Sequence, residues 1–163
     1  VIRIEECPNP SVVTIEIGGA GETGTEEVIR GIHDSLRSTS LALNEYVLPG
    51  AGAIHSRIAH AVRLASEKQA GRERLAMEAF ARAMETIPST LVENAGGEPL
   101  DRILELRATS LGEPPVGISE DGKKWIVRGV WHPRSVIENS LQSATETAIG
   151  MLRIDQVISA RGE

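Results

Sequence analysis

Residues 53–65 read AIHSRIAHAVRLA, and the spacing of the apolar side chains in this stretch decides the fold class. Ile54, Ile58 and Val62 recur every four residues, which places them on one face of an α-helix. Capping and periodicity signals on either side predict further helices over residues 25–44, 72–86, 88–95, 99–108 and 133–160. The sequence therefore predicts a mainly α-helical bundle.

Two small β elements accompany the predicted helices. Residues 12–17 are β-branched with a partly alternating pattern, which predicts an N-terminal strand. Residues 116–119 and 124–127 are two apolar runs that flank an Asp-Gly pair at 121–122. Because Asp-Gly between apolar runs favours a tight two-strand turn, these residues are expected to form a β-hairpin.

Charge and composition exclude several classes of partner. The 163 residues carry 17 Lys+Arg against 23 Asp+Glu, for a net charge of −6. An acidic chain with no basic run lacks the electrostatic footprint of a nucleic-acid binder, and anionic membrane surfaces are disfavoured for the same reason. No apolar run approaches the ~20 residues of a membrane span, so a cytoplasmic location is expected. A lone cysteine, Cys7, is interpreted as an ordinary thiol, and no metal site is predicted.

A glycine-rich segment offers one competing interpretation. Residues 19–24 read GAGETG and match the G-x-G-x-x-G pattern of dinucleotide-binding turns, between a predicted strand and a predicted helix. However, Glu22, Glu26 and Glu27 put carboxylates where a pyrophosphate would sit. A flexible connection between strand and helix is therefore favoured over a dinucleotide site.

The most promising chemical pair is Asp34 with the turn Gly50-Ala51-Gly52. Asp34 lies within the predicted helix 25–44, and the turn lies where the next helix begins. Amide groups at a glycine-rich helix start can bind an anion, and a carboxylate can position or deprotonate water. Without further residues, a tight connection between helices is the favoured interpretation of the turn.

Several ordered motifs resemble one family, the group II chaperonins, which comprise the archaeal thermosome and the eukaryotic cytosolic chaperonin. LPGAGA at 48–53 is similar to the family's Pro-Gly-Gly-Gly-Ala turn. Colinear matches span nearly the whole chain: CPNP at 7–10, GRERLA at 71–76, EAFA at 78–81, ENAG at 93–96, SATE at 143–146 and LRID at 152–155.

The resemblance implies a fold and a set of site residues in the C-terminal portion of a chaperonin subunit. Residues 1–47 correspond to a strand leaving the apical domain and an intermediate-domain helix, and residues 48–163 to the C-terminal half of an equatorial, ATP-binding domain. Asp34 falls on the family's water-activating aspartate. The predicted nucleotide-contacting residues are Gly50, Ala51, Gly52, Ser119 and His132, of which Ser119 and His132 replace family acids.

The same resemblance implies an incomplete ATPase. The family's phosphate loop and magnesium-holding aspartate lie in an N-terminal half that has no counterpart here, so ATP and Mg²⁺ are expected as cofactors of a complete subunit only. Expected partners are other chaperonin subunits or a complementary N-terminal half, with unfolded client proteins reached through the parent. Apolar faces at 53–65 and 136–157 are predicted to lack partners, which should cause self-association or a rearranged helical bundle. The alternative is a stand-alone truncated interaction protein without ATPase activity.

Overall fold

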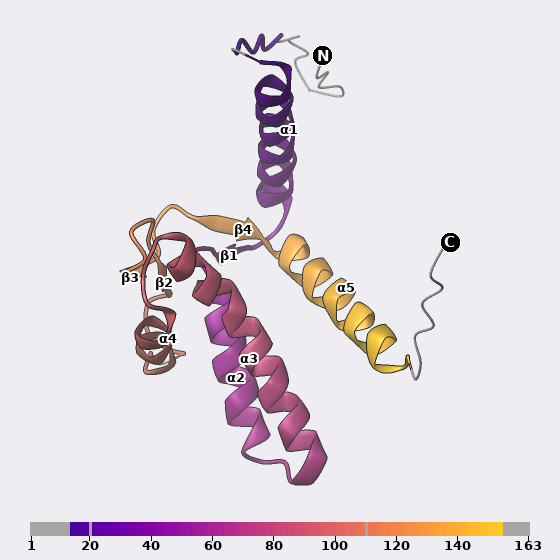
Figure 1. The fold of residues 1–163 in the computed structure, drawn as a ribbon, viewed down its shortest axis with the longest axis vertical. Helices are drawn as coiled ribbons and strands as arrows, with labels where there is room; N and C mark the ends of the chain where they lie inside the picture. Colours follow the sequence, from indigo (N-terminus) through magenta and orange to yellow (C-terminus); the bar gives the residue numbers. More distant parts are fainter. Residues whose placement is uncertain (1–13, 20, 110, 155–163) are drawn as a thin grey trace, which may run out of the picture. The chain divides into compact units, whose positions relative to one another are not determined.

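The described residues form five α-helices and four short β-strands (Figure 1). The structure is a computed structural model, and it describes residues 14–19, 21–109 and 111–154. The elements are α1 (Glu22–Asn44), β1 (Val47–Pro49), α2 (Ala53–Ser66), α3 (Gly71–Asn94), α4 (Pro99–Arg107), β2 (Val116–Ile118), β3 (Lys124–Ile126), β4 (Trp131–Pro133) and α5 (Arg134–Leu152). The predicted mainly helical fold is confirmed.

The chain divides into two compact units. One unit is Val47–His132, and the described residues before Val47 and after His132 make up the other. The predicted domain division after residue 47 stays a prediction. No helix of the described residues is long and apolar enough to cross a bilayer.

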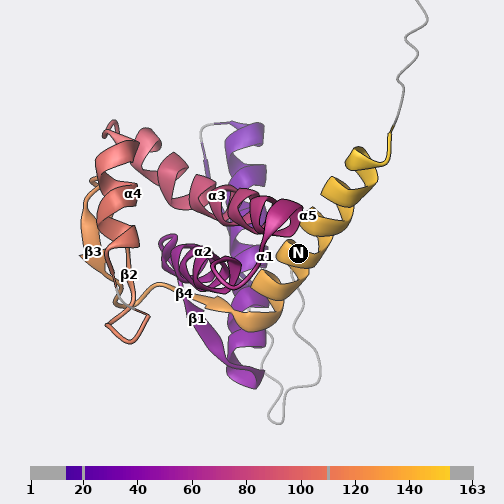
Figure 2. The same ribbon diagram turned by 90° about the horizontal axis from the view of Figure 1, so that it is seen from below.

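Helices α2 and α3 form an antiparallel hairpin, and they lie side by side in both views (Figures 1 and 2). Ala53, Ala59 and Ala81 are fully buried. Because alanine has only a methyl side chain, these positions let two helices approach closely. Helix α3 therefore covers the alanine face of α2, whereas Ile54, Ile58 and Val62 of the predicted apolar face are only half-buried. The prediction that the apolar face of 53–65 lacks a partner stays a prediction.

A small apolar core ties the hairpin to the β elements. Val92 of α3, Ile103 and Leu106 of α4, and Ile118 of β2 form one buried cluster. Strands β2 and β3 pair antiparallel, with Val116 opposite Ile126. The hairpin predicted from the Asp-Gly pair is confirmed, and its first strand belongs to the core.

One prediction about Pro88 is wrong. The sequence predicts a break at this proline and a new helix after it, whereas α3 runs without interruption from Gly71 to Asn94. Proline removes one backbone hydrogen bond from a helix interior. Pro88 is fully buried, and a Cβ added at Gly52 would lie only 2.9 Å from the Pro88 Cβ. Close packing against the start of α2 offsets the lost hydrogen bond.

The N-terminal predictions also need correction. Residues 14–17 form no strand, and residues 12 and 13 lie outside the described part of the chain. Helix α1 begins at Glu22, so Thr25, predicted as its N-cap, lies inside the first turn and donates to the Gly21 carbonyl at 3.0 Å. Because no strand precedes the glycine-rich segment within residues 14–19, the dinucleotide-binding interpretation loses its structural context.

The helix predicted over 133–160 is shorter than expected. Helix α5 ends at Leu152, and Arg153 caps it, while residues 155–160 lie outside the described part. Pro133 ends β4 instead of opening the helix, and the pairing of β4 with β1 was not predicted. These two strands have three residues each, which is too short for a periodic signal.

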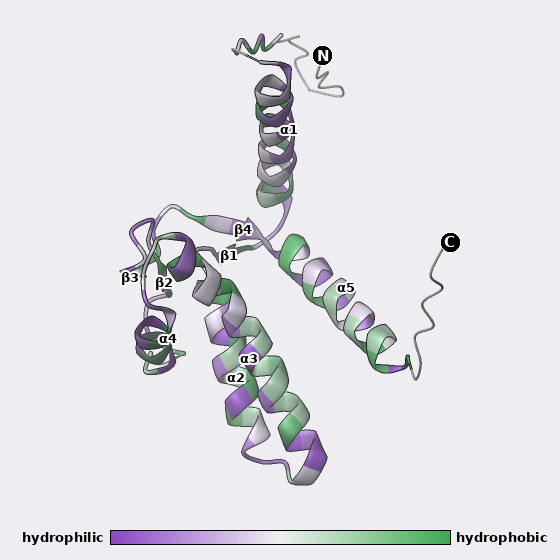
Figure 3. Cartoon of the chain, in the orientation of Figure 1, coloured by the Kyte–Doolittle hydropathy of each residue, from purple (hydrophilic) through white to green (hydrophobic). Residues whose placement is uncertain are grey.

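Several large apolar side chains of α1 and α5 are exposed. Figure 3 shows the hydropathy of the residues along both helices. No residue of α1 is buried, and Ile137 is the buried residue of α5. Leu43 is 82% exposed and Leu152 is 85% exposed. Exposed apolar faces of this kind mark surfaces that other protein segments cover. The predicted self-association is compatible with these faces and stays a prediction.

Three helices are joined by a single buried carboxylate. Glu85 of α3 is 7% exposed and accepts hydrogen bonds from Arg63 of α2 and from Arg107 of α4, at 2.6 Å in each case to Oε2. Burial raises the pKa of Glu85, but the hydrogen bonds from Arg107 and Arg63 outweigh it, and the net pKa is lowered from 4.5. Glu85 therefore stays ionised and holds both arginines.

Replacing Glu85 with glutamine is expected to destabilise the Val47–His132 unit. The substitution leaves two arginines without their shared acceptor charge, and breaking a buried ion pair of this kind costs about 3 kcal/mol. Urea unfolding at pH 7 measures the loss. Because the carboxylate stabilises only while ionised, the difference between parent and variant should vanish as the pH falls through the lowered pKa of Glu85, below 4.5.

Glu105→Gln is the matched control for Glu85→Gln. Glu105 pairs with Arg102 on the same helix, with both side chains more than a third exposed. Exposed pairs contribute below about 1 kcal/mol. Equal losses in the two variants would contradict a special role for Glu85.

Candidate functional site

The chain enters α2 through a left-handed turn. The Ala53 amide donates to the Gly50 carbonyl at 2.9 Å, and the two residues between them have positive φ, 53° for Ala51 and 74° for Gly52. Two consecutive positive φ values are typical of a type I′ turn. Gly52 adopts this conformation without strain, whereas Ala51 carries a Cβ that disfavours it. Strained backbone of this kind is often found at binding sites.

Two backbone hydrogen bonds fix this turn within the unit. The Ile118 amide donates to the Ala51 carbonyl at 2.9 Å, and the Gly50 amide donates to the Val130 carbonyl at 2.9 Å. A Cβ added at Gly117 would clash with the Ala51 carbonyl oxygen. The absence of a side chain at 117 therefore lets the hairpin dock directly on the turn.

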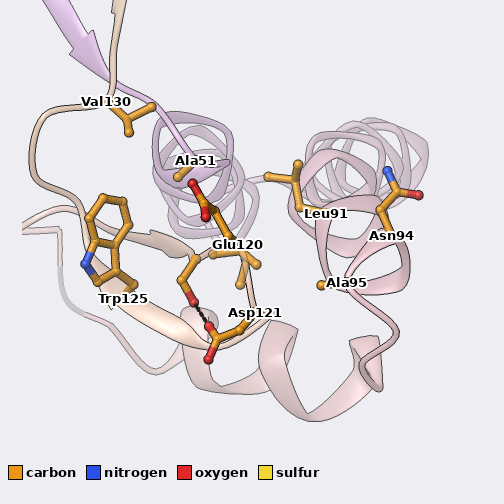
Figure 4. Close-up of a pocket in the computed structure, with 10 residues that line it drawn as sticks. Ala51, Leu91, Asn94, Ala95, Glu120, Asp121, Trp125 and Val130 are labelled. Carbon is orange, nitrogen blue, oxygen red and sulfur yellow. Dashed lines mark hydrogen bonds between the residues drawn. The ribbon is translucent and has the colours of Figure 1, made fainter.

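A cleft of about 760 Å³ opens where the turn, the β2–β3 hairpin and the end of α3 meet (Figure 4). Trp125 and Val130 lie on one side of it. Leu91 and Asn94 of α3 lie on the other side, with Ala95, the residue that caps this helix. The remaining lining residues are Ala51, Ile118, Ser119, Glu120 and Asp121. The cleft thus has apolar walls and a short acidic segment between them.

Asp121 is the most strongly perturbed acid in the cleft. The Lys123 ammonium donates to its Oδ2 at 2.6 Å, and the Ser119 hydroxyl donates to its Oδ1. These two hydrogen bonds, that from Lys123 first, lower the pKa of Asp121 to about 2. Asp121 is therefore ionised at every physiological pH and presents a hydrogen-bond acceptor.

The lining chemistry suits a flat organic group with hydroxyl or amino donors. An indole can stack on a heteroaromatic ring, and the carboxylates of Glu120 and Asp121 can accept hydrogen bonds from such donors. The lining residues include no lysine or arginine. No group of three potential metal-ligating side chains occurs in the described part of the chain. The cleft therefore fits a nucleoside better than it fits phosphates, and the described residues do not fit a magnesium site.

The structure brings together most of the predicted nucleotide-contacting residues. Ala51 and Ser119 line the cleft, and Gly50 and Gly52 complete the adjoining turn. His132 borders that turn without lining the cleft, with its Nε2 3.3 Å from the position of a Cβ added at Gly50.

Asp34, the predicted catalytic residue, belongs to the other unit. It lies on α1 with 73% of its side chain exposed, and its Oδ1 is 3.7 Å from His33 Nδ1. An exposed carboxylate is available to a ligand or to another segment. Its assignment stays a prediction.

Sequence reasoning missed Asp121 and Trp125 as site residues. Asp121 was interpreted only as half of the hairpin turn, and Trp125 only as part of a strand. The signal that could have found them is the hairpin itself, because a tight turn brings residue 121 back beside residue 119. A carboxylate thus stands in the cleft although Ser119 replaces the family's acid.

His55, in the first turn of α2, has an unusual environment. Its Nδ1 is buried and has no hydrogen-bond partner among the described residues. Burial, followed by the nearby His132, lowers the pKa of His55 below 6.5. Folding therefore favours the neutral imidazole.

Acid is expected to destabilise the Val47–His132 unit through His55. The unfolded chain takes up a proton near pH 6.5 while folded His55 resists it, so His55 lowers the stability as the pH falls below about 6.5. Unfolding by urea between pH 7.5 and pH 5 measures this slope. His55→Leu should flatten it, and His33→Gln, at an exposed position of α1, should leave it unchanged. A slope that survives in His55→Leu would refute the assignment.

The comparisons with known proteins all point to one family of chaperonins. Residues 1–162 match the model of the TCP-1/cpn60 chaperonin family. The chain is 40% identical to a thermosome subunit beta of Archaeoglobus fulgidus over 99% of its own length and 31% of that protein. It is 39% identical to a thermosome subunit of Methanocaldococcus jannaschii over 98% of its length and 31% of that protein. The chain thus spans about a third of the length of these relatives.

A solved structure shares the fold. The open-state monomer of a group II chaperonin from Methanococcoides burtonii superposes with a TM-score of 0.62 at 29% sequence identity. The match covers 66% of this chain and 28% of that one. Together with the family match, it confirms the predicted resemblance to group II chaperonins.

Proposed function

The chain belongs to the TCP-1/cpn60 chaperonin family, and we propose that it acts as the C-terminal portion of a group II chaperonin subunit that uses ATP to assist protein folding. The observation that carries this proposal is the cleft beside the Gly50–Gly52 turn. There Ala51 and Ser119, two residues on which the family resemblance places nucleotide contacts, lie together with Trp125 and Asp121. In this proposal the cleft holds the adenosine part of the nucleotide.

The acidic and apolar lining of the cleft suits the adenosine part of ATP and not its phosphates. Trp125 and Leu91 provide apolar surface for the base, and Asp121 accepts a hydrogen bond from a ribose hydroxyl or the adenine amino group. No cationic side chain lines the cleft to neutralise a triphosphate. Phosphate and Mg²⁺ ligands are therefore proposed to come from another part of a complete subunit, which supplies the charge neutralisation that phosphoryl transfer needs.

In the complete subunit, Asp34 is proposed to position the attacking water. Its side chain is exposed on α1, in a different unit from the cleft, so it would act after a conformational closure. A carboxylate in this role orients water and accepts its proton. This places hydrolysis under the control of domain movement.

The exposed apolar faces support a role in assembly. Leu43 of α1 and Leu152 of α5 are largely exposed, and the family relatives are named as thermosome subunits. We propose that these faces are covered by other chaperonin segments or subunits in the cytoplasm, and that clients are reached through that assembly. The alternative is a truncated interaction protein without ATPase activity. The missing acid at position 119 was one reason for this alternative. That reason is weaker in the structure, because Asp121 beside Ser119 provides a carboxylate in the cleft.

ADP is expected to quench the fluorescence of Trp125 as it enters the cleft. In a Trp131→Phe background, Trp125 is the one remaining tryptophan of the chain. Asp121→Asn should weaken ADP about tenfold, since it removes one hydrogen bond to a charged acceptor. Asp101→Asn, on the exposed start of α4 outside the cleft, is the control and should bind like the parent. Trp125 emission that does not change when ADP is added would favour the alternative, a truncated interaction protein without ATPase activity.

The isolated chain is expected to show negligible ATP turnover. In a subunit completed with the remaining segments of a thermosome relative, Asp34→Asn should lower kcat by about 10²–10⁴, the usual contribution of a general base. ADP affinity should stay constant, because Asp34 is assigned to the water and not to the nucleoside. Glu26→Gln, another exposed acid of α1, is the control. Full activity in Asp34→Asn would remove the catalytic assignment while leaving the nucleotide cleft intact.

A further inference from the structure

A second cleft, separate from the nucleoside cleft, has the opposite charge. It lies between the end of α2, the first half of α3 and the end of α4, with a volume of about 290 Å³. Its charged lining consists of Arg63, Arg74, Arg82, Arg107, Glu67 and Glu78. Four guanidinium groups around one small cavity are unusual in a chain whose net charge is −6.

Two of these arginines are fixed in place by Glu85. Arg63 donates through both terminal nitrogens, and Arg107 donates through Nε at 2.8 Å and through one terminal nitrogen at 2.6 Å. A guanidinium has five N–H donors, so each arginine keeps donors beyond the two that Glu85 occupies. One carboxylate also balances only one of the two positive charges. The pair is therefore oriented but not neutralised.

The other two arginines lie on α3, eight residues or about two helical turns apart. Arg74 donates from Nε to Glu78 at 2.8 Å. Arg82 is exposed and has no hydrogen-bond or ion-pair partner among the described residues. Glu67, at the end of α2, lies near Arg74 and contributes the remaining negative charge. The cleft keeps a positive excess even when Glu67, Glu78 and Glu85 are all ionised.

We propose that this arginine cleft binds a compact, multiply charged oxyanion of the phosphate class. Guanidinium groups recognise phosphate oxygens through paired N–H donors, and the rigid pair on Glu85 provides such donors at little further entropic cost. Arg82 supplies a charge that no carboxylate of the described residues balances. The site is independent of the nucleoside cleft, since the two share no lining residue.

Titration calorimetry with inorganic phosphate in a low-salt chloride buffer tests the site. A saturable isotherm is expected, and it should weaken as sodium chloride is added because the contacts are partly exposed. Arg82→Gln should reduce the affinity at least about tenfold by removing a charged hydrogen-bond donor. Glu67→Gln should increase the affinity, since it removes a repelling carboxylate, and a merely structural role for the cleft predicts no such increase.

Arg72→Gln is the matched control. Arg72 is an exposed arginine of the same helix that does not line the cleft, so its loss should leave the phosphate isotherm unchanged. Equal weakening by Arg72→Gln and Arg82→Gln would show unspecific charge attraction and overturn the proposal. Failure of phosphate to bind, together with a changed sedimentation coefficient in Arg82→Gln, would overturn it in favour of a carboxylate from a second copy of the chain.

Discussion

The Val47–His132 unit depends on a turn at which three glycines let neighbouring segments approach closely. Gly52 approaches Pro88 of α3, Gly117 approaches the Ala51 carbonyl, and Gly50 donates its amide to Val130. A Cβ at any of these three positions would lie closer than 3.0 Å to a neighbouring atom, so the residues at the turn are tightly constrained. The cleft proposed to hold the nucleoside follows from this constraint, because the hairpin can reach Ala51 only where position 117 has no side chain.

The helices of this chain could be predicted because their signals are local. The end of α1 at Asn44, the start of α2 at Ala53 and the hairpin around Asp121 follow from periodicity, glycines and turn residues that lie next to one another in sequence. Pro88 shows where local rules fail. Its effect on α3 is decided by packing against Gly52, which is 36 residues away, and no single-sequence pattern reports that contact.

The backbone turn of the candidate site was predicted from the sequence, but the side chains of Asp121 and Trp125 that line the cleft were not. The Gly50–Gly52 turn carries a recognisable motif, and Ser119 sits at a position where the family has an acid. The substitution at 119 suggested a weakened pocket. In three dimensions the Ser119 hydroxyl instead donates to Asp121, so the serine orients a carboxylate that the same hairpin delivers from two residues away. A comparison of single positions cannot detect this pairing, because it depends on the tight turn that brings residues 119 and 121 together.

Net charge describes the long-range field of a protein, and local chemistry can oppose it. The value of −6 argues against a nucleic-acid partner, whose recognition needs an extended basic surface. It does not argue against a small anion, which contacts only the few groups around one cavity. Along α3, Arg74 and Arg82 line a basic cleft, and twelve residues beyond Arg82, about 18 Å further along the helix, Asn94 lines an acidic one. One helix therefore lines two clefts of opposite charge, and the residues around each cleft, not the net charge of the chain, decide which kind of ligand it suits.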